Sequence, residues 1–123
     1  IFYEHNFSSK LDSDPWIIGC QNGIYDLKIN EFRDGRPDDY IVKCTNYDYV
    51  PKHLIQQSVI DEVTLFMEQL FPVEELRRYM WDHLASTLIG TNENQTFNIY
   101  TGSGRNGKSM LVLLIVPQLL QII

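Results

Sequence analysis

Hydrophobic and polar residues alternate between Trp16 and Val50 in the manner of short β-strands. The apolar run Trp16–Cys20 is followed by Gln21-Asn22-Gly23, and Asn-Gly favours a hairpin turn because it accepts positive φ at low cost. The next segment, Ile24–Leu27, alternates as a half-buried strand does. Further short strands are predicted over residues 30–33, 40–44 and 47–50. Together these segments predict a small β meander.

Beyond Pro51 the apolar residues recur at spacings of three and four, which is the period of an amphipathic helix. Pro72 is placed in the first turn of a second helix, with the acidic pair Glu74-Glu75 behind it, where negative charge is favoured. Gly90 is the expected C′ residue of that second helix. The first apolar stripe consists of Ile55, Val59, Val63, Phe66, Met67 and Leu70, and the second of Leu76, Met80, Leu84 and Leu88.

A strand, a glycine-rich loop and a helix are predicted in that order near the end of the chain. Thr96–Tyr100 predicts a short strand, the loop follows at once, and an apolar helix is expected from about Lys108. The loop satisfies the pattern G-x-x-x-x-G-K-[ST], which is typical of phosphate-binding loops. Its eight residues are Gly102, Ser103, Gly104, Arg105, Asn106, Gly107, Lys108 and Ser109.

Each fixed position of this pattern has a physical role in holding a nucleotide such as ATP. Gly102 and Gly107 permit backbone angles that a β-carbon would forbid, so that successive N–H groups can turn toward an anion. The following helix adds its unpaired N-terminal amides. Lys108 is the candidate catalytic residue, because it places a cation on the β- and γ-phosphates. The Ser109 hydroxyl is placed to ligate Mg²⁺, which bridges those phosphates.

The pattern specifies a ligand but no reaction. Average composition produces it by chance in a chain of 123 residues on the order of once in a few hundred chains. Ser103, Arg105 and Asn106 occupy its variable positions, and Arg105 is expected to face solvent. Kinases, GTPases, transporters and helicases all use such a loop. Hydrolysis also needs a second strand with acidic residues and a charge donor, which are expected outside this segment.

The predicted fold is an α+β module, made of the β meander and two helices, followed by the first strand, phosphate loop and helix of an α/β nucleotide hydrolase. We expect a β-rich module over residues 1–50, a helical segment over 51–95, and the truncated start of the hydrolase domain over 96–123. Hydrophobic residues make up 44% of the chain, enough for a buried core. The chain begins with Ile1 and ends on an apolar run, which is expected of a piece of a longer protein.

Charge and cysteine content restrict the partners and the compartment. A net charge of −6 argues against binding DNA through bulk electrostatics, so any DNA contact must be local or lie outside this segment. Cys20 and Cys44 are expected to be reduced and half-buried. The absence of a signal peptide predicts an intracellular protein that is not secreted. The run from Met110 to Ile123 is too short to span a membrane, and no membrane partner is expected.

Three stretches, in this order, resemble one family of viral replication proteins. They are Asn22–Leu27 (NGIYDL), Gly35–Ile41 (GRPDDYI) and Gly102–Ser109 (GSGRNGKS). The chain from about Trp16 to about Leu114 is similar to the poxvirus-type primase-helicases of nucleocytoplasmic large DNA viruses and to the related phage and plasmid primases. In that family these motifs connect a pre-helicase module to the phosphate-binding loop.

The resemblance implies a superfamily 3 helicase of the AAA+ type, which works as a ring of six identical subunits on single-stranded or forked DNA, often beside a primase domain. It implies ATP and Mg²⁺ as cofactors. Gly102–Lys108 would bind the phosphates, Lys108 would supply the positive charge, and Ser109 would ligate Mg²⁺. It also implies a location in the host cytoplasm or at the viral replication site. The contacts to DNA are expected in regions outside this segment.

Two other hypotheses remain open from the sequence. One is a phosphoryl-transferring kinase or another ATPase with the same loop. The other is that residues 1–90 form a non-catalytic interaction or oligomerisation module. For the segment alone we expect weak nucleotide binding at most and no turnover.

Overall fold

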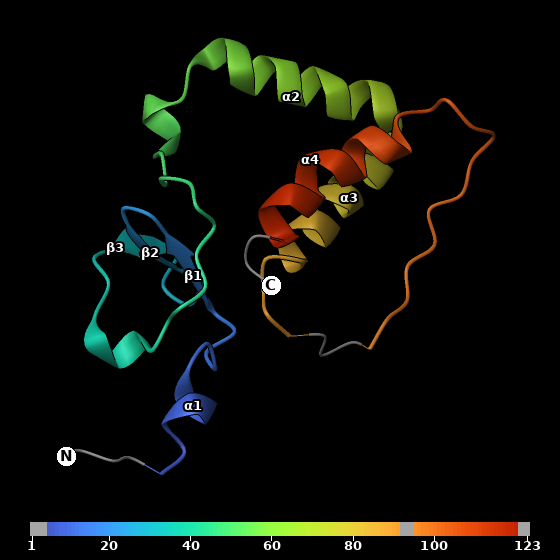
Figure 1. Ribbon diagram of the computed structural model, residues 1–123. Coiled ribbons are helices and arrows are strands. Elements are labelled where there is room, and N and C mark those ends of the chain that lie inside the picture. The colour runs from blue at the N-terminus through green and yellow to red at the C-terminus, as the bar shows by residue number, and fades with distance from the viewer. Residues whose placement is uncertain (1–4, 92–94, 121–123) are drawn as a thin grey trace. The chain divides into compact units, whose positions relative to one another are not determined.

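The computed structural model describes residues 5–91 and 95–120, which form two compact units (Figure 1). The described residues of the first unit are 5–49, 89–91 and 118–120, and those of the second are 50–88 and 95–117. The first unit contains the β-strands and the second contains the long helices.

A three-stranded antiparallel sheet forms the centre of the first unit. After the short helix α1 (Phe7–Lys10), the strands β1 (Ile17–Cys20), β2 (Gly23–Asp26) and β3 (Glu31–Arg33) follow in spatial order β1-β2-β3. Cys20 pairs with Gly23, so the hairpin turn consists of Gln21 and Asn22. The predicted strands around residues 16–33 are therefore confirmed. Ile24, in the central strand, is the buried apolar residue of this sheet, at 3% exposure.

The two further strands predicted over residues 40–44 and 47–50 were wrong. This segment follows β1 through single backbone hydrogen bonds, from Thr45 N to Gly19 O and from Gln21 N to Tyr47 O, without forming a regular ladder. The Asp12 carboxylate accepts the N–H groups of Val42 and Lys43 at 2.8 and 3.0 Å. Because a side chain takes these donors, they are not available to a neighbouring strand.

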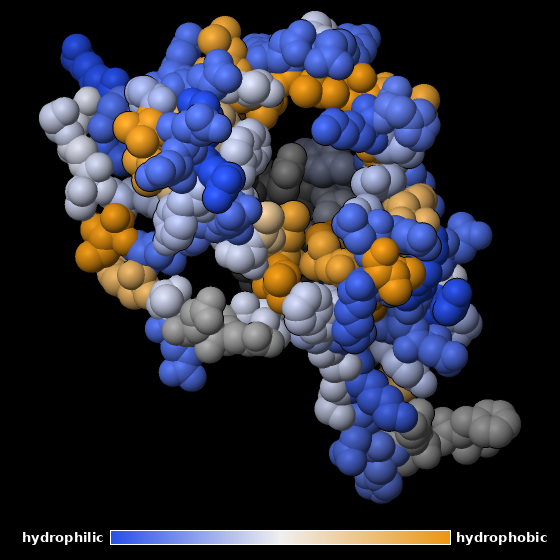
Figure 2. All heavy atoms as spheres, turned by 180° about the vertical axis from the view of Figure 1, so that it is seen from behind, coloured by the Kyte–Doolittle hydropathy of each residue, from blue (hydrophilic) through white to orange (hydrophobic). Residues whose placement is uncertain are grey.

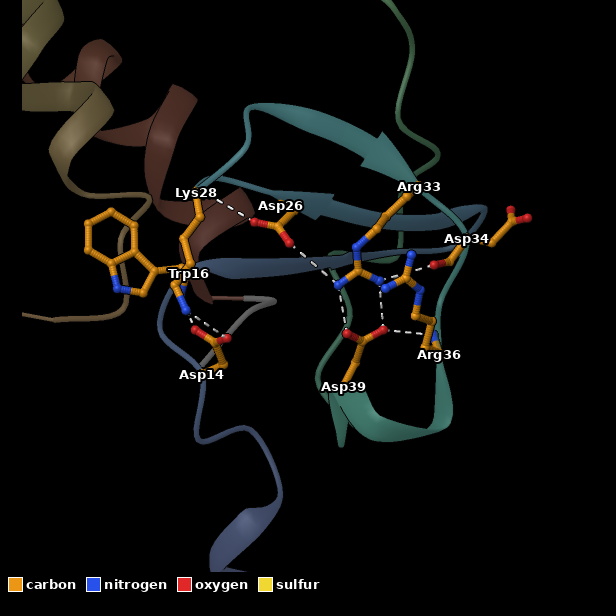
Figure 3. A network of polar contacts seen from close by, with 8 residues as sticks. All are labelled: Asp14, Trp16, Asp26, Lys28, Arg33, Asp34, Arg36 and Asp39. Atoms are coloured by element: carbon orange, nitrogen blue, oxygen red, sulfur yellow. Dashed lines mark hydrogen bonds and ion pairs between the residues drawn. The ribbon is translucent and has the colours of Figure 1, made fainter.

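An ion-pair network fastens the 3₁₀-helix η1 (Pro37–Asp39) to the sheet (Figure 3). Arg33 of β3 donates two hydrogen bonds to the Asp39 carboxylate, at 2.9 and 2.7 Å, and lies 3.5 Å from Asp26 of β2. Asp39 also accepts the backbone N–H of Arg36 at 2.6 Å. These contacts hold the pKa of Asp39 at about 2, with the Arg33 hydrogen bonds as the largest cause. The paired geometry is the strongest form of an ion pair between arginine and a carboxylate.

Three helices share the core of the second unit. After the 3₁₀-helix η2 (Lys52–Leu54), they are α2 (Gln57–Leu70), α3 (Glu74–Ser86) and α4 (Lys108–Leu120) (Figure 1). Each contributes one buried residue: Met67 from α2, Met80 from α3 and Leu111 from α4. Phe66, Leu70, Phe71 and Leu84 pack around them. The helical period predicted from the apolar spacing is thus confirmed, as is the start of the last helix at Lys108.

The ends of α3 differ from the prediction. Pro72 precedes the helix, whose N-cap is Val73, while Glu74 and Glu75 do occupy the first turn. The helix ends at Ser86, and Gly90 is not its C′ residue but donates its N–H to the Pro15 carbonyl at 2.9 Å. The hydroxyls of Ser86 and Thr87 donate to the carbonyls of His83 and Leu84, both at 2.6 Å. The last carbonyls are satisfied in this way, and a left-handed glycine is not required.

Part of the predicted apolar stripes remains exposed in the second unit. Val59 and Val63 of α2 are 47% and 42% exposed, and Leu76 of α3 is 47% exposed. Figure 2 shows apolar surface along one side of α2, beside the polar residues of its other side. No helix of the described residues is long and apolar enough to cross a membrane.

The strand predicted over Thr96–Tyr100 is not formed. The segment is irregular, and Phe97 and Ile99 are 88% and 71% exposed. A strand needs a ladder partner for its backbone groups, and within residues 5–91 and 95–120 the only sheet is the one formed by β1, β2 and β3. The division into three parts at residues 50 and 95 stays a prediction, although α2, α3 and α4 share one core.

The Arg33–Asp39 pair makes the stability of the first unit depend on pH. Asp39 has a folded pKa of about 2 and an unfolded value of 3.8, so its contribution is complete above about pH 4 and is lost as the pH falls toward 2. We expect Asp39→Asn to lower the melting temperature near neutral pH, since it replaces a charged acceptor of Arg33. The difference from the parent chain should shrink as the pH approaches 2.

Asp38→Asn is the matched control, because Asp38 lies beside Asp39 in η1 but is exposed. Thermal melts followed by circular dichroism at several pH values measure both variants. Equal melting temperatures for Asp39→Asn and the parent chain at pH 7 would contradict the role given to the pair.

Candidate functional site

The predicted phosphate-binding loop leads directly into the first turn of α4. Residues 102–106 are exposed, Gly107 and Lys108 are half-buried, and Ser109 is exposed in the first turn of the helix. Leu111 donates its N–H to the Gly107 carbonyl at 3.0 Å, which closes that first turn. The N–H groups of residues 108–110 precede the helical ladder and have no acceptor within a regular α-helix. They are therefore the donors that a bound anion would use.

The backbone of the loop is left-handed at three positions. The φ angles are +91° at Gly104, +51° at Arg105 and +77° at Gly107. Gly107 was predicted to need such an angle, and it does. Gly102 was predicted to need one as well, but its φ is not in this region and the reason for glycine there is space. A β-carbon at Gly102 would overlap Asn106 Nδ2 and Lys108 Nζ. Arg105 adopts the left-handed conformation with a side chain, which carries a steric cost.

Gly107 packs against α2, so that the end of the loop lies on this helix. A β-carbon at this position would lie 2.9 Å from Leu70 Cδ1 and 4.0 Å from Phe66 Cε2, both in α2. Such a distance to Leu70 is shorter than van der Waals contact allows, so α2 lies directly against the end of the loop. This contact and the burial of Leu111 fix the first turn of α4 on the shared core.

The two residues with predicted chemical roles follow each other at the start of α4. The Lys108 ammonium donates a hydrogen bond to the Asn106 side-chain oxygen. Ser109 is exposed, so its hydroxyl is accessible to a metal ion outside the helix. Ser103 and Arg105 are exposed as well, as expected for Arg105.

The residue types of the loop fit the triphosphate of a nucleotide together with Mg²⁺. An ammonium, unpaired helix-terminal amides and an exposed hydroxyl lie on one short segment, and the absence of a side chain at Gly102 makes room for the Lys108 ammonium. Amides and an ammonium bind phosphate oxygens, and a hydroxyl suits Mg²⁺. The segment therefore has groups that suit the phosphates of a nucleotide, and a hydroxyl that could supply one ligand to the metal ion.

A contact that sequence reasoning missed lies immediately before the loop. The Tyr100 hydroxyl and His83 Nε2 are hydrogen-bonded at 2.6 Å, with their rings edge to face. The Tyr79 ring lies parallel to that of His83, one helical turn away in α3. Burial raises the pKa of the Tyr100 phenol, and Tyr79 adds to this shift. The four-residue spacing of Tyr79 and His83 was visible in the sequence, but nothing there indicated Tyr100 as their partner.

The first unit contains another missed contact. Asn22, predicted only as a turn residue, accepts the Tyr49 N–H at 2.8 Å and donates to the Tyr49 carbonyl at 3.0 Å. Tyr49 in turn stacks on Phe32, with ring centroids 4.7 Å apart. Cys20 and Cys44 are free and half-buried, as predicted. Burial raises the pKa of the Cys20 thiol, which makes it a poor nucleophile.

Comparison with known proteins relates the chain to one family and to several viral proteins. A family described as “D5 N terminal like” matches residues 5–85. A protein of Acanthamoeba polyphaga mimivirus, named “Putative helicase L207/L206”, is 39% identical over 94% of this chain. “Putative helicase 121R” of Invertebrate iridescent virus 3 is 33% identical over 89% of the chain, and “Putative helicase 184R” of Invertebrate iridescent virus 6 is 33% identical over 85%.

The chain spans only a small part of these relatives. It covers 12% of the length of the mimivirus protein, 12% of the first iridescent virus protein and 11% of the second. The loop at residues 102–109 lies beyond the residues that the family matches, whereas α2 and most of α3 lie within them.

Replacing Gly107 should disrupt the packing of the loop against Leu70 of α2. We expect Gly107→Ala to destabilise the second unit by about 1–3 kcal/mol, because it adds a left-handed alanine and a clash with Leu70. Gly104→Ala is the matched control: Gly104 also has a positive φ, but a β-carbon there would meet nothing within 4 Å. Denaturant unfolding measures both. If Gly104→Ala costs as much as Gly107→Ala, the contact with Leu70 is unimportant.

Proposed function

Since the chain belongs to the D5 N terminal like family, we propose that it provides the ATP-binding loop of an ATP-dependent DNA helicase. The observation that carries this proposal is the phosphate-loop pattern at Gly102–Ser109, which leads into the N-terminus of α4. The names of the viral relatives support the reaction class, because each includes the word helicase. The loop itself would serve any nucleotide hydrolase, so the choice of helicase rests on the relatives.

In the proposed role, the loop holds the phosphates of ATP in three ways. The N–H groups at the start of α4 and in the left-handed turn donate to phosphate oxygens. The Lys108 ammonium neutralises the β- and γ-phosphates, where negative charge shifts during transfer. The Ser109 hydroxyl would supply one ligand to Mg²⁺, and the bound ion would add positive charge that stabilises the phosphates. The absence of a side chain at Gly102 leaves room for Asn106 and Lys108, and its absence at Gly107 leaves room for Leu70 of α2.

The remaining parts of the reaction are proposed for the rest of the protein. Hydrolysis needs acidic residues that complete the Mg²⁺ site and orient water, and an arginine that stabilises the transferred charge. The net charge of −6 fits a segment that leaves most of the binding of single-stranded or forked DNA to other regions. A ring of six subunits and a linked primase domain complete the proposal for the whole protein.

Lys108→Ala in the full-length protein tests the loop. We expect unwinding of forked DNA to fall to background and the affinity for ATP to fall on the order of tenfold or more, because a charge-assisted contact to phosphate is lost. Strand displacement and binding of a fluorescent ATP analogue measure these effects. Lys52→Ala is the control, since Lys52 is an exposed lysine of η2. Full ATPase activity in Lys108→Ala would overturn the assignment.

DNA dependence of ATP turnover separates the proposed reaction from the alternatives. A helicase hydrolyses ATP faster when single-stranded DNA is present, whereas a kinase with the same loop does not. If the rate of ATP turnover is the same with and without DNA, and the phosphate is transferred to an acceptor other than water, the kinase is favoured.

Ser109→Ala tests the proposed metal ligand. We expect ATP affinity to fall in the presence of Mg²⁺ and to change little in excess chelator, since only the metal-bridged contact involves the hydroxyl. Calorimetric titration with and without Mg²⁺ measures the difference. An equal loss under both conditions would show that Ser109 acts on the phosphates or on the fold rather than on the metal.

A further inference from the structure

Asn106 occupies a variable position of the phosphate-loop pattern, yet its side chain lies at the centre of the loop. Its amide oxygen accepts a hydrogen bond from Lys108 Nζ. Its amide nitrogen and Lys108 Nζ both lie in the space that a β-carbon at Gly102 would fill, and its Cγ would be 3.3 Å from that carbon. Asn106, Lys108 and the first glycine of the pattern therefore meet at one point.

The local backbone explains how a side chain two residues before Lys108 can reach it. Arg105 and Gly107, on either side of Asn106, are both left-handed, with φ angles of +51° and +77°. Two left-handed residues around one residue fold the chain tightly and bring the side chains at 106 and 108 to the same side. The steric cost of the left-handed Arg105 accompanies this turn.

A neutral amide is suited to holding this ammonium before ATP arrives. Lysine has a long flexible side chain, so fixing it in advance reduces the rotamer freedom that is lost on binding. The amide oxygen fixes the ammonium without cancelling its charge, whereas a carboxylate would pair with it and repel phosphate. The ammonium has three N–H donors, so one bond to Asn106 leaves two for phosphate oxygens.

We propose that Asn106 is a positioning residue that holds the Lys108 ammonium ready for the phosphates of the nucleotide. This inference rests on the proposed function, because it assigns to Lys108 the phosphate contact described there. Asn106 acts through Lys108, and it is not required to touch the nucleotide itself.

A double-mutant cycle in the full-length protein tests this role. Asn106→Ala should weaken the binding of an ATP analogue about three- to tenfold, the range of one typical hydrogen bond. In a Lys108→Ala background the same change should have no effect, because the residue through which it acts is gone. Asn98→Ala is the control, an exposed asparagine in the preceding segment. Asn106→Ser serves as a second variant if Asn106→Ala does not fold.

Chemical modification of Lys108 gives a readout that does not depend on ATP. Without nucleotide, Asn106→Ala should speed the acylation of Lys108 by acetic anhydride about three- to tenfold, measured by mass spectrometry, because the Lys108 amino group is released from its partner and its free-amine form can attack the anhydride. The rates at Lys52 and Lys43 should stay unchanged.

The outcomes separate failure of this inference from failure of the proposed function. An equal loss of affinity in both backgrounds, or no loss in the parent background, overturns the positioning role of Asn106. An unchanged acylation rate overturns the contact itself. If Lys108→Ala leaves ATP binding intact, the proposed function fails, and the acylation rates still decide whether Asn106 holds Lys108.

Discussion

Burial of Leu111 among the residues of two earlier helices is the contact on which the geometry of the loop depends. Leu111 lies three residues after Lys108, in the first turn of α4, and packs with Met67 of α2 and Met80 of α3. A residue buried so close to a helix start fixes the position of that start. The unpaired N–H groups of the first turn then point to one place. The loop is thus oriented by apolar packing, although every group that it would use on a ligand is polar.

The first unit relies on a different kind of interaction. Its sheet has short strands and buries Ile24. The long segment after β3 is held by polar contacts, together with the stacking of Tyr49 on Phe32. Arg33 and Asp39 meet in a paired hydrogen bond, while the Asp12 carboxylate takes the N–H groups of Val42 and Lys43. Asp39 is the second aspartate of GRPDDYI, a stretch that carries the family resemblance. Its structural role is to pair with Arg33. Charge pairing holds irregular backbone in place where a hydrophobic core is small.

The sequence predicted those elements whose cause is local. The hairpin of β1 and β2, the period of α2 and α3, and the start of α4 at Lys108 follow from turn residues and apolar spacing, and the structure has them. Predictions failed where the cause lies elsewhere in the chain. Residues 40–44 alternate like a strand, but the Asp12 carboxylate accepts the N–H groups of Val42 and Lys43. Thr96–Tyr100 has the composition of a strand, but no strand lies beside it among the described residues to form a ladder.

At the candidate site, the motif indicated which residues matter. It could not indicate the contact of Asn106 with Lys108, of Gly107 with α2, or of Tyr100 with His83, because each requires a folded chain.

The close approach of Gly107 to Leu70 also restricts how this part of the protein can vary. The two residues are far apart in the chain, and only one of them lies in the segment matched by the family. A larger side chain at position 70 would push against the loop, and a side chain at position 107 would require a smaller neighbour in α2. Related proteins that keep glycine at position 107 should therefore carry a side chain no larger than leucine at position 70. For the same reason, a boundary placed between α3 and the loop, to express the two parts separately, would remove the surface on which the loop rests.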